Sequence, residues 1–185
     1  MPGMAEKPPN DSNLYEAALN HLARYPSTEA SIARLLTKRV QKWARLQASP
    51  DTTPDEAEAA AAKRAITTVI ARLKAEGVLN DAAFALAREK RLRREGKSRL
   101  YAIAHLAAKG VAPSTAKTLL PEDPDRELAA ACAYLRRRRA GPFGDAPEPK
   151  TLAALARTGF SQDIAERALR LDRDTAEELI RKMRE

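Results

Sequence analysis

Apolar residues recur along this chain at the spacing of amphipathic helices. One predicted helix, opened by the Thr-Pro-Asp-Glu sequence at 53–56, carries an apolar stripe of Ile66, Val69, Ile70 and Leu73. Residues at such intervals share one helix face, because a turn takes about 3.6 residues. A C-terminal helix is predicted on the same ground, with a stripe of Leu179, Ile180 and Met183. The pattern thus predicts a series of helices that each bury one face.

Helix ends follow a pattern that occurs three times. Residues 32–40, 103–111 and 152–160 align without gaps, and in each an aliphatic residue is followed by leucine three positions later. The second and third copies end in Gly-Val and Gly-Phe. Glycine accepts the left-handed conformation of a Schellman cap, in which the next residue packs on the leucine five positions earlier. We expect contacts of Leu106 with Val111 and of Leu155 with Phe160.

The first copy has Arg39 where the others have glycine, so a weaker or different cap is expected there. Leu73, Gly77 and Val78 repeat the arrangement at the end of another predicted helix. Helix starts are marked by residues that cap the free backbone N–H groups. These are Asn13 with Glu16, Ser27, Thr53 before Pro54, Asn80, Asp123 before Pro124, Ser161, and Asp174 with Glu177.

Each copy lies between two other predicted helices, so the chain divides into three-helix repeats. The predicted segments are a disordered tail at 1–12, a first repeat at 13–78 with an insertion at 43–54, a second repeat at 79–122, a third at 123–171, and a C-terminal helix at 172–185. Repeats that share only neighbour interfaces form an elongated, curved array. Such an array suits a long partner better than a small substrate.

Composition supports an all-α fold. About a fifth of the 185 residues are alanine, whereas valine and isoleucine are few and aromatics make up 4%. Alanine favours helices, and sheets need β-branched and aromatic residues. With 44% apolar and 31% charged residues, the chain is expected to fold.

The net charge of +8 is unevenly placed. Residues 88–99 carry seven Lys or Arg and two Glu, and residues 136–139 are all Arg, so the rest of the chain sums to about −1. Such patches favour contact with a polyanion, of which a nucleic-acid backbone is the commonest, although a solvated helix face is the simpler alternative. The candidate binding residues are Lys90, Arg91, Arg93, Arg94, Lys97, Arg99, Arg136, Arg137, Arg138 and Arg139.

Few other side chains suggest base recognition or catalysis. Few aromatic residues lie near basic ones, Trp43 and Tyr101 being the candidates for stacking, so phosphate contacts are expected to outweigh base stacking. Gly96-Lys97-Ser98 resembles the end of a phosphate-binding loop, but Arg91 replaces the glycine this loop requires. A buried apolar role is expected for Cys132 and a surface position for His105.

No enzyme, cofactor or metal site is predicted, and a single cysteine excludes an internal disulfide. The polar N-terminus does not read as a signal peptide, and no apolar run has the length of a membrane span. We therefore expect a cytoplasmic protein without membrane contact. A monomer is expected, since no heptad seam is visible.

Four blocks in order resemble the RecX family of regulatory proteins, which modulate the RecA recombinase. They are 18–27, 73–87 (LKAEGVLNDAAFALA), 93–111 (RREGKSRLYAIAHLAAKGV) and 155–168 (LARTGFSQDIAERA), within a resemblance over about 14–171. The chain departs from the family pattern at Val78, where an aromatic residue is usual, at Asn80-Asp81, and by its insertion at 43–54.

The resemblance implies a non-enzymatic regulator in DNA repair, homologous recombination and the SOS response. Family members lie in the helical groove of the RecA filament on DNA and restrain its ATPase and strand-exchange activities. The ten basic residues would then meet filament acids or phosphates of the mainly single-stranded DNA, while ATP and magnesium belong to RecA. Capping a growing filament end and locking neighbouring subunits are both open mechanisms. A non-specific DNA-binding protein acting without RecA and a helical adaptor for another protein remain alternatives.

Overall fold

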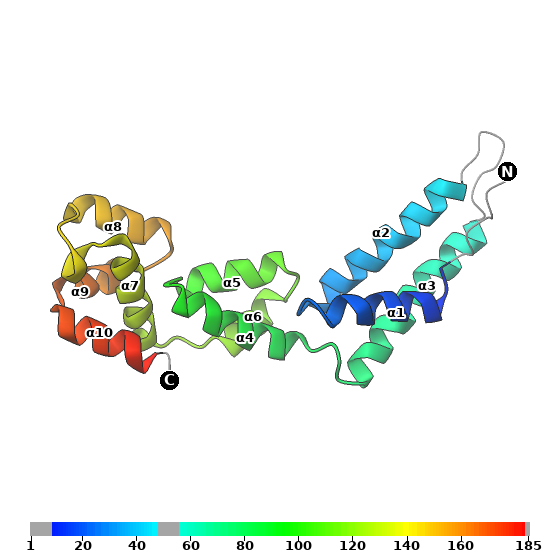
Figure 1. Ribbon diagram of the computed structural model, residues 1–185, viewed down its shortest axis with the longest axis horizontal. Helices are drawn as coiled ribbons and strands as arrows, with labels where there is room; N and C mark the ends of the chain where they lie inside the picture. The colour runs from blue at the N-terminus through cyan, green and yellow to red at the C-terminus, as the bar shows by residue number, and fades with distance from the viewer. Residues whose placement is uncertain (1–8, 48–55, 184–185) are drawn as a thin grey trace. The chain divides into compact units, whose positions relative to one another are not determined.

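The structure, a computed structural model, describes residues 9–47 and 56–183 of the chain (Figure 1). All regular elements in these ranges are helices, and no β-strand occurs in them. The prediction of an all-α fold is therefore confirmed. Contacts between helices divide the chain after Phe84 into an N-terminal unit and a C-terminal unit.

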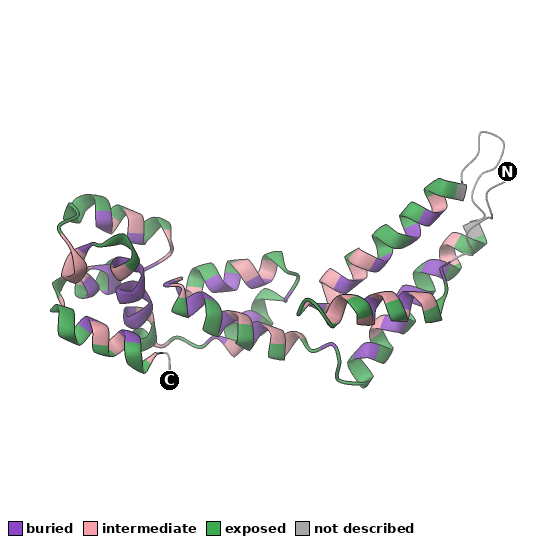
Figure 2. Ribbon diagram, viewed as in Figure 1, coloured by how far each residue is buried: buried purple, intermediate pink, exposed green. Residues whose placement is uncertain are grey.

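The N-terminal unit consists of three helices, α1 (Asp11–Leu22), α2 (Glu29–Gln47) and α3 (Glu56–Ala75), each packed on the other two. Their buried faces form one apolar core, purple in Figure 2, composed of Leu14, Ala18, Ile32, Leu36, Val40, Ala62, Ala65, Ile66, Val69, Leu73 and Leu79. The helical spacing of these residues is what the sequence pattern predicted.

The C-terminal unit contains most of α4 (Asp81–Arg94) and all of α5 (Arg99–Ala108), α6 (Pro113–Leu119), α7 (Pro124–Arg138), the short 3₁₀ helix η1 (Gly141–Phe143), α8 (Glu148–Arg157), α9 (Gln162–Arg170) and α10 (Arg173–Lys182). None of the described helices combines the length and apolarity that a membrane span requires. The division of these helices into repeats stays a prediction.

Helix α7 is the packing centre of the C-terminal unit. Residues 128–135 are all buried, and α9 and α10 pack against them (Figures 1 and 2). Half of these residues are alanine, so the neighbouring helices can approach closely. Cys132 lies among them, and burial raises the pKa of its thiol to about 11. Its expected role as a small buried apolar residue is confirmed, since a thiol in this setting stays protonated.

The two predicted glycine caps are confirmed. The Val111 N–H donates to the Leu106 carbonyl at 3.0 Å, and the Phe160 N–H donates to the Leu155 carbonyl at 3.2 Å. The glycine before each donor has a positive φ, and all four residues are buried. Each cap therefore closes its helix by the backbone bond and the apolar contact together.

The prediction of a cap at Arg39 is wrong, because α2 continues to Gln47. Val40 and Trp43 extend the apolar stripe of this helix and are buried, so nothing in the pattern stops it at Arg39. The predicted insertion at 43–54 therefore begins inside α2, and its residues from 48 onward lie outside the described ranges. At the end of α3, Leu79 rather than Val78 returns to Leu73, with its N–H 3.1 Å from the Leu73 carbonyl.

The predicted caps at Asn80, Asp123 and Ser161 are confirmed by their side-chain hydrogen bonds. Three other helices start at neighbouring residues. Asn10 and Asn13 form a reciprocal capping box before α1, Thr28 replaces Ser27 before α2, and Asp172 replaces Asp174 before α10. Helix α1 thus begins at Asp11, inside the predicted tail; residues 1–8 and 53–55 lie outside the described ranges.

A short turn at 95–98 joins α4 to α5 and lies directly against α7. Gly96 has a φ of +68°, and a Cβ built on it would lie 2.6 Å from the backbone nitrogen of Tyr134. The turn closes α4 as the glycine caps do, with the Lys97 N–H donating to the Leu92 carbonyl at 3.0 Å. Glycine is required here both for the left-handed backbone and for the close approach to α7.

We expect Gly96→Ala to lower the free energy of unfolding by about 3 kcal/mol, because it adds overpacking against α7 to the cost of a left-handed alanine. Gly77→Ala is the matched control: Gly77 has a φ of +71° but no atom within 4 Å of an added Cβ. It should cost only about 1 kcal/mol. Urea unfolding followed by circular dichroism measures both, and equal losses would show that contact with α7 does not constrain Gly96.

Candidate nucleic-acid interface

The basic segment, residues 88–99, covers the last turns of α4, the turn at 95–98 and the first residue of α5. Its side chains fall into two groups. Lys90, Arg91 and Arg94 are exposed, whereas Arg93 is buried and Arg99 is partly buried. The segment is therefore not a uniformly solvated helix face, and its buried members have structural partners.

Three contacts fix the start of α5 on the rest of the C-terminal unit. The Ser98 hydroxyl donates to the Thr158 carbonyl at 2.6 Å and accepts the Tyr101 N–H, which makes Ser98 the N-cap of α5. The Arg99 N–H donates to both carboxylate oxygens of Glu127 on α7, at 3.0 Å each. Burial raises the pKa of Glu127, while this N–H and the cations of Arg93 and Arg99 act in the opposite direction.

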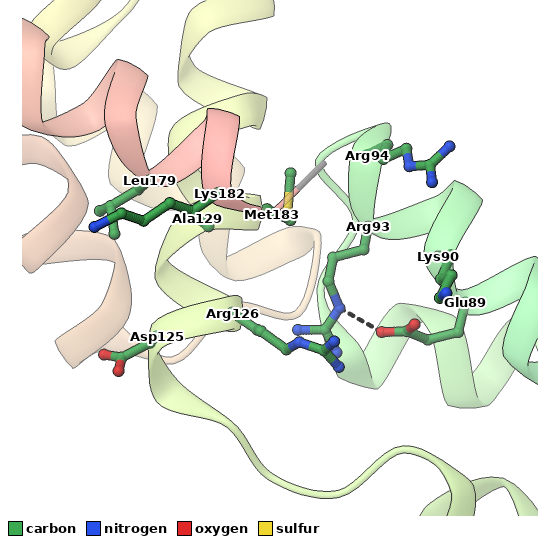
Figure 3. Close-up of a pocket in the computed structure, with 10 residues that line it drawn as sticks. All are labelled: Glu89, Lys90, Arg93, Arg94, Asp125, Arg126, Ala129, Leu179, Lys182 and Met183. Carbon is green, nitrogen blue, oxygen red and sulfur yellow. Dashed lines mark hydrogen bonds and ion pairs between the residues drawn. The ribbon is translucent and has the colours of Figure 1, made fainter. Parts of the chain in front are cut away.

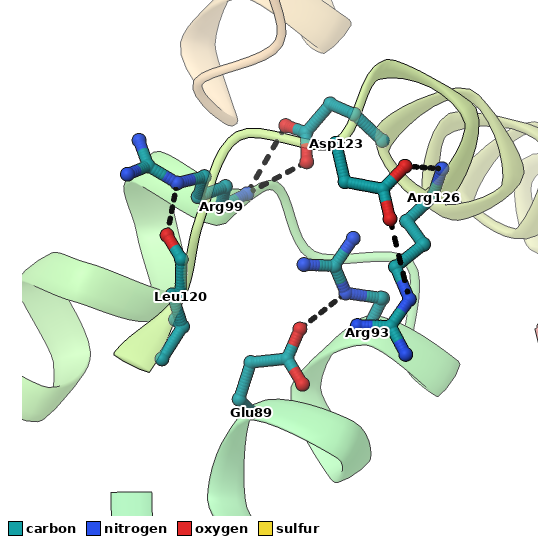
Figure 4. Close-up of polar contacts among 7 residues, drawn as sticks. Glu89, Arg93, Arg99, Leu120, Asp123 and Arg126 are labelled. Carbon is teal, nitrogen blue, oxygen red and sulfur yellow. Dashed lines mark hydrogen bonds and ion pairs between the residues drawn. The ribbon is translucent and has the colours of Figure 1, made fainter. Parts of the chain in front are cut away.

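The Arg99 side chain also points into the protein. Its Nε donates to the Leu120 carbonyl at the end of α6 (Figure 4). Its Nη1 lies 3.6 Å from a Glu122 oxygen. These two interactions join α5 to the segment between α6 and α7. This geometry assigns Arg99 a structural role in the isolated chain.

Arg93 is the most deeply buried charge of the basic segment. Its side chain is 8% exposed and pairs with Glu89, one turn earlier on α4, whose side chain is 9% exposed (Figure 4). The bond from Arg93 Nε to Glu89 satisfies only part of the guanidinium. Arg93 Nη1 is buried and has no hydrogen-bond partner among the described residues.

The other cations of the basic segment have weaker contacts. Arg91 forms an exposed ion pair with Glu95 at 3.0 Å, and the Lys97 ammonium lies 4.7 Å from the centre of the Tyr101 ring. Exposed pairs of this kind contribute about 1 kcal/mol or less, so both cations remain available to a polyanion. Lys90 and Arg94 have no acid within ion-pair distance in the described part of the chain.

The arginine run at 136–139 ends α7. Like the basic segment, it contains residues with partners inside the chain and residues that are exposed. Arg136 pairs with Glu177 of α10 at 2.7 Å, and Arg138 lies 5.5 Å from the centre of the Tyr134 ring. Arg139 takes the left-handed position after the helix, with a φ of +51°, where glycine is usual. Arg137, Arg138 and Arg139 are exposed.

A pocket of about 500 Å³ brings together basic residues that are far apart in the sequence (Figure 3). Lys90, Arg93 and Arg94 of α4 line it together with Arg126 of α7 and Lys182 of α10. Sequence analysis missed the last two, because Arg126 stands among the acids of residues 122–127 and Lys182 lies far along the chain from the basic segment. Only the packing of α4 near α7 and α10 shows their connection with the basic segment.

The structure also shows how far Trp43, Tyr101 and His105 are exposed. Trp43 is buried in α2, so it is not available for base stacking. Tyr101 is 39% exposed and stacks on His105, which accepts a hydrogen bond from Arg88 at 3.0 Å. Burial and the neighbouring Arg88 cation lower the pKa of His105, so it stays neutral at pH 7. His105 is therefore partly buried and adds no positive charge.

The site's chemistry is that of anion binding. Guanidinium and ammonium groups recognise phosphate or carboxylate oxygens, with arginine suited to two parallel bonds. In the described ranges, no group of three or more His, Cys, Asp or Glu residues is placed to hold a metal ion.

Comparisons with known proteins give a consistent result. No protein-family model matches the chain. Regulatory protein RecX of Myxococcus xanthus is 33% identical over 165 residues, which cover 84% of this chain and 83% of that protein. Regulatory protein RecX of Agrobacterium fabrum is 33% identical over 107 residues, 55% of this chain and 57% of that protein.

Two crystal structures share the fold. A structure of regulatory protein RecX superposes with a TM-score of 0.60 at 20% identity, covering 84% of this chain and 70% of its own. The structure of RecX from Lactobacillus salivarius gives a TM-score of 0.56 at 19% identity, covering 93% and 97%. At these identities, the structural likeness supports the fold.

The Glu89–Arg93 pair yields a stability test. Glu89→Met should lower the free energy of unfolding by about 3 kcal/mol, because it leaves a buried guanidinium unpaired. Glu89→Met/Arg93→Met should recover most of that loss, to within about 1 kcal/mol of the original chain, since two apolar side chains of similar length replace the pair. Urea unfolding of the original chain, both single variants and the double variant measures the coupling. Additive losses would show that the two charges do not depend on each other.

Proposed function

Because this chain belongs to the RecX family of regulatory proteins, as its sequence blocks predicted, we propose that it regulates the RecA recombinase. It binds the RecA filament on DNA, in the helical groove, and restrains ATP hydrolysis and strand exchange. The family is one of regulators and not of enzymes, and the chain contributes binding surface alone. ATP, magnesium and the DNA strand belong to the filament.

The observation that carries this proposal is a group of cations at the end of α4 and in the turn after it, of which three are exposed and Lys97 is partly buried. Lys90, Arg91, Arg94 and Lys97 lie on a segment whose backbone is held by Ser98 and Glu127. A fixed backbone presents these charges without a large ordering cost on binding. A filament on DNA offers phosphates and acidic side chains, and the cations suit both.

The contacts within the chain support dividing the candidate residues between the fold and the filament. Arg99 and Arg136 have intramolecular partners and are assigned to holding the fold. Arg93 pairs with Glu89 through its Nε, which supports the fold, but its Nη1 has no partner among the described residues. Lys90, Arg91, Arg94 and Lys97 are assigned to binding, and Arg137 and Arg139 to a second contact. By bridging neighbouring RecA subunits, the bound chain either blocks addition at a filament end or locks their relative movement. Both mechanisms lower ATP turnover.

The test is RecA's DNA-dependent ATP hydrolysis, with this protein titrated from substoichiometric amounts at near-physiological salt. Lys90→Ala/Arg91→Ala/Arg94→Ala/Lys97→Ala should raise the concentration for half-inhibition by roughly tenfold or more, because several charge contacts are lost at once. The control is Lys38→Ala/Arg39→Ala/Lys63→Ala/Arg64→Ala, which removes the same charge from exposed positions of α2 and α3. The control should inhibit as the original chain does.

The arginine run has its own variant, Arg137→Ala/Arg139→Gly. Glycine at 139 relieves the left-handed arginine, so the charges are removed without loss of fold. Weaker inhibition of RecA by this variant would mean that the arginine run contacts the filament. Unchanged inhibition would mean that it does not.

Other outcomes contradict the proposal. No effect of the original chain on RecA at any ratio would favour an adaptor for another protein. Inhibition that disappears when DNA is in excess, with tight DNA binding in the absence of RecA, would favour a non-specific DNA-binding protein. Inhibition at a few copies per filament supports end-capping, whereas inhibition only near saturation supports groove occupation.

A further inference from the structure

We propose that the pocket between α4, α7 and α10 is a binding site for a nucleotide phosphate. Its walls carry the cations of Lys90, Arg93, Arg94, Arg126 and Lys182 and the acids of Glu89 and Asp125 (Figure 3). The net charge of the residues that line the pocket is therefore positive, even after both acids are counted. The inference deepens the proposed function, on which it rests for the source of the phosphate.

The first argument is the unsatisfied guanidinium of Arg93. Its side chain is more than nine-tenths buried, and its Nη1 has no hydrogen-bond partner among the described residues. Glu89 accepts only from Nε. A buried donor without an acceptor is costly, and a charged one more so. An oxyanion in the pocket would provide the acceptor that Arg93 lacks.

The second argument is the position of Arg126. Figures 3 and 4 show the guanidinium groups of Arg93 and Arg126 next to each other, although they come from different helices. Asp123 contacts the Nε of Arg126 at 3.5 Å, and the Arg126 side chain is largely exposed. An anion between two neighbouring like charges offsets their repulsion. A phosphate has enough oxygens to accept from both groups.

The remaining wall fits the rest of a nucleotide. Ala129, Leu179 and Met183 provide an apolar side, and a volume of about 500 Å³ exceeds what a lone phosphate needs. Lys182 is held by Glu178 at 2.8 Å in an exposed pair, so its ammonium contributes mainly through the local field. The phosphate would lie between Arg93 and Arg126, with sugar and base toward the apolar side. A unit of a DNA strand and a free nucleotide share this chemistry.

The experiment uses the full chain without RecA. Binding of a fluorescent single-stranded thymidine oligonucleotide is followed by anisotropy, and binding of free thymidine triphosphate by calorimetry. Arg126→Gln is expected to weaken binding of the preferred probe by roughly tenfold, because it removes a charged hydrogen-bond donor to phosphate. It should also lower the slope of log affinity against log salt for the oligonucleotide by about one. Lys182→Gln should weaken binding about threefold, the smaller effect of a long-range charge.

Matched controls are Arg181→Gln and Lys117→Gln, which remove exposed cations of the same unit that do not line the pocket. Both should change affinity less than about twofold. Arg126 and Lys182 are exposed, so all four variants are expected to fold, and thermal melts confirm this before binding is measured.

The oligonucleotide and triphosphate measurements distinguish the two possible sources of phosphate. Loss confined to the oligonucleotide identifies a strand phosphate, and loss confined to the triphosphate identifies a free nucleotide. Equal small losses in pocket and control variants, or no loss in any, would overturn the inference. Because RecA is absent from this experiment, it can fail while inhibition of RecA is intact, and the converse also holds.

Discussion

The C-terminal unit depends on the contact between the turn at 95–98 and helix α7. Gly96 lies so close to the Tyr134 backbone that a side chain has no room, and Glu127 accepts the first N–H of α5. Ser98 adds the bond to the end of α8. These contacts fix the ends of α4 and α5 relative to α7. The same contacts place Arg93 beside Arg126, so the geometry of the basic pocket follows from the turn.

Much of the fold could be predicted from the sequence because its signals are local. Gly110 and Gly159 end helices by their own backbone preference, and Asn80 and Asp123 begin them by their own side chains. Errors arose where two local signals competed. Ser27 and Thr28 are both capping residues, but the Ser27 hydroxyl donates to the Tyr25 carbonyl, and Thr28 accepts the Ser31 N–H. At Arg39 the absence of glycine was the informative signal, because the apolar stripe simply continues.

The candidate site was predictable in part. The charge of residues 88–99 is visible in the sequence, and the exposure of Lys90 and Arg94 agrees with a binding surface. The burial of Arg93 was not visible, since its neighbours in sequence are as basic as it is. Arg126 could not be connected with this segment by any local pattern. Long-range packing decides which arginine holds the fold and which is available, and a single sequence does not specify that packing.

The buried Glu89–Arg93 pair is an inefficient way to stabilise a helix. Replacing such a pair with apolar residues is often neutral or stabilising, so stability alone does not account for it. Arg93 lines a cationic pocket, and the pair leaves its Nη1 without an acceptor among the described residues. A purely structural pair would have its remaining donors satisfied, as the backbone N–H of Arg99 is by Glu127. The unsatisfied donor therefore argues for an anionic ligand, and it connects the stability of α4 with the occupancy of the proposed site.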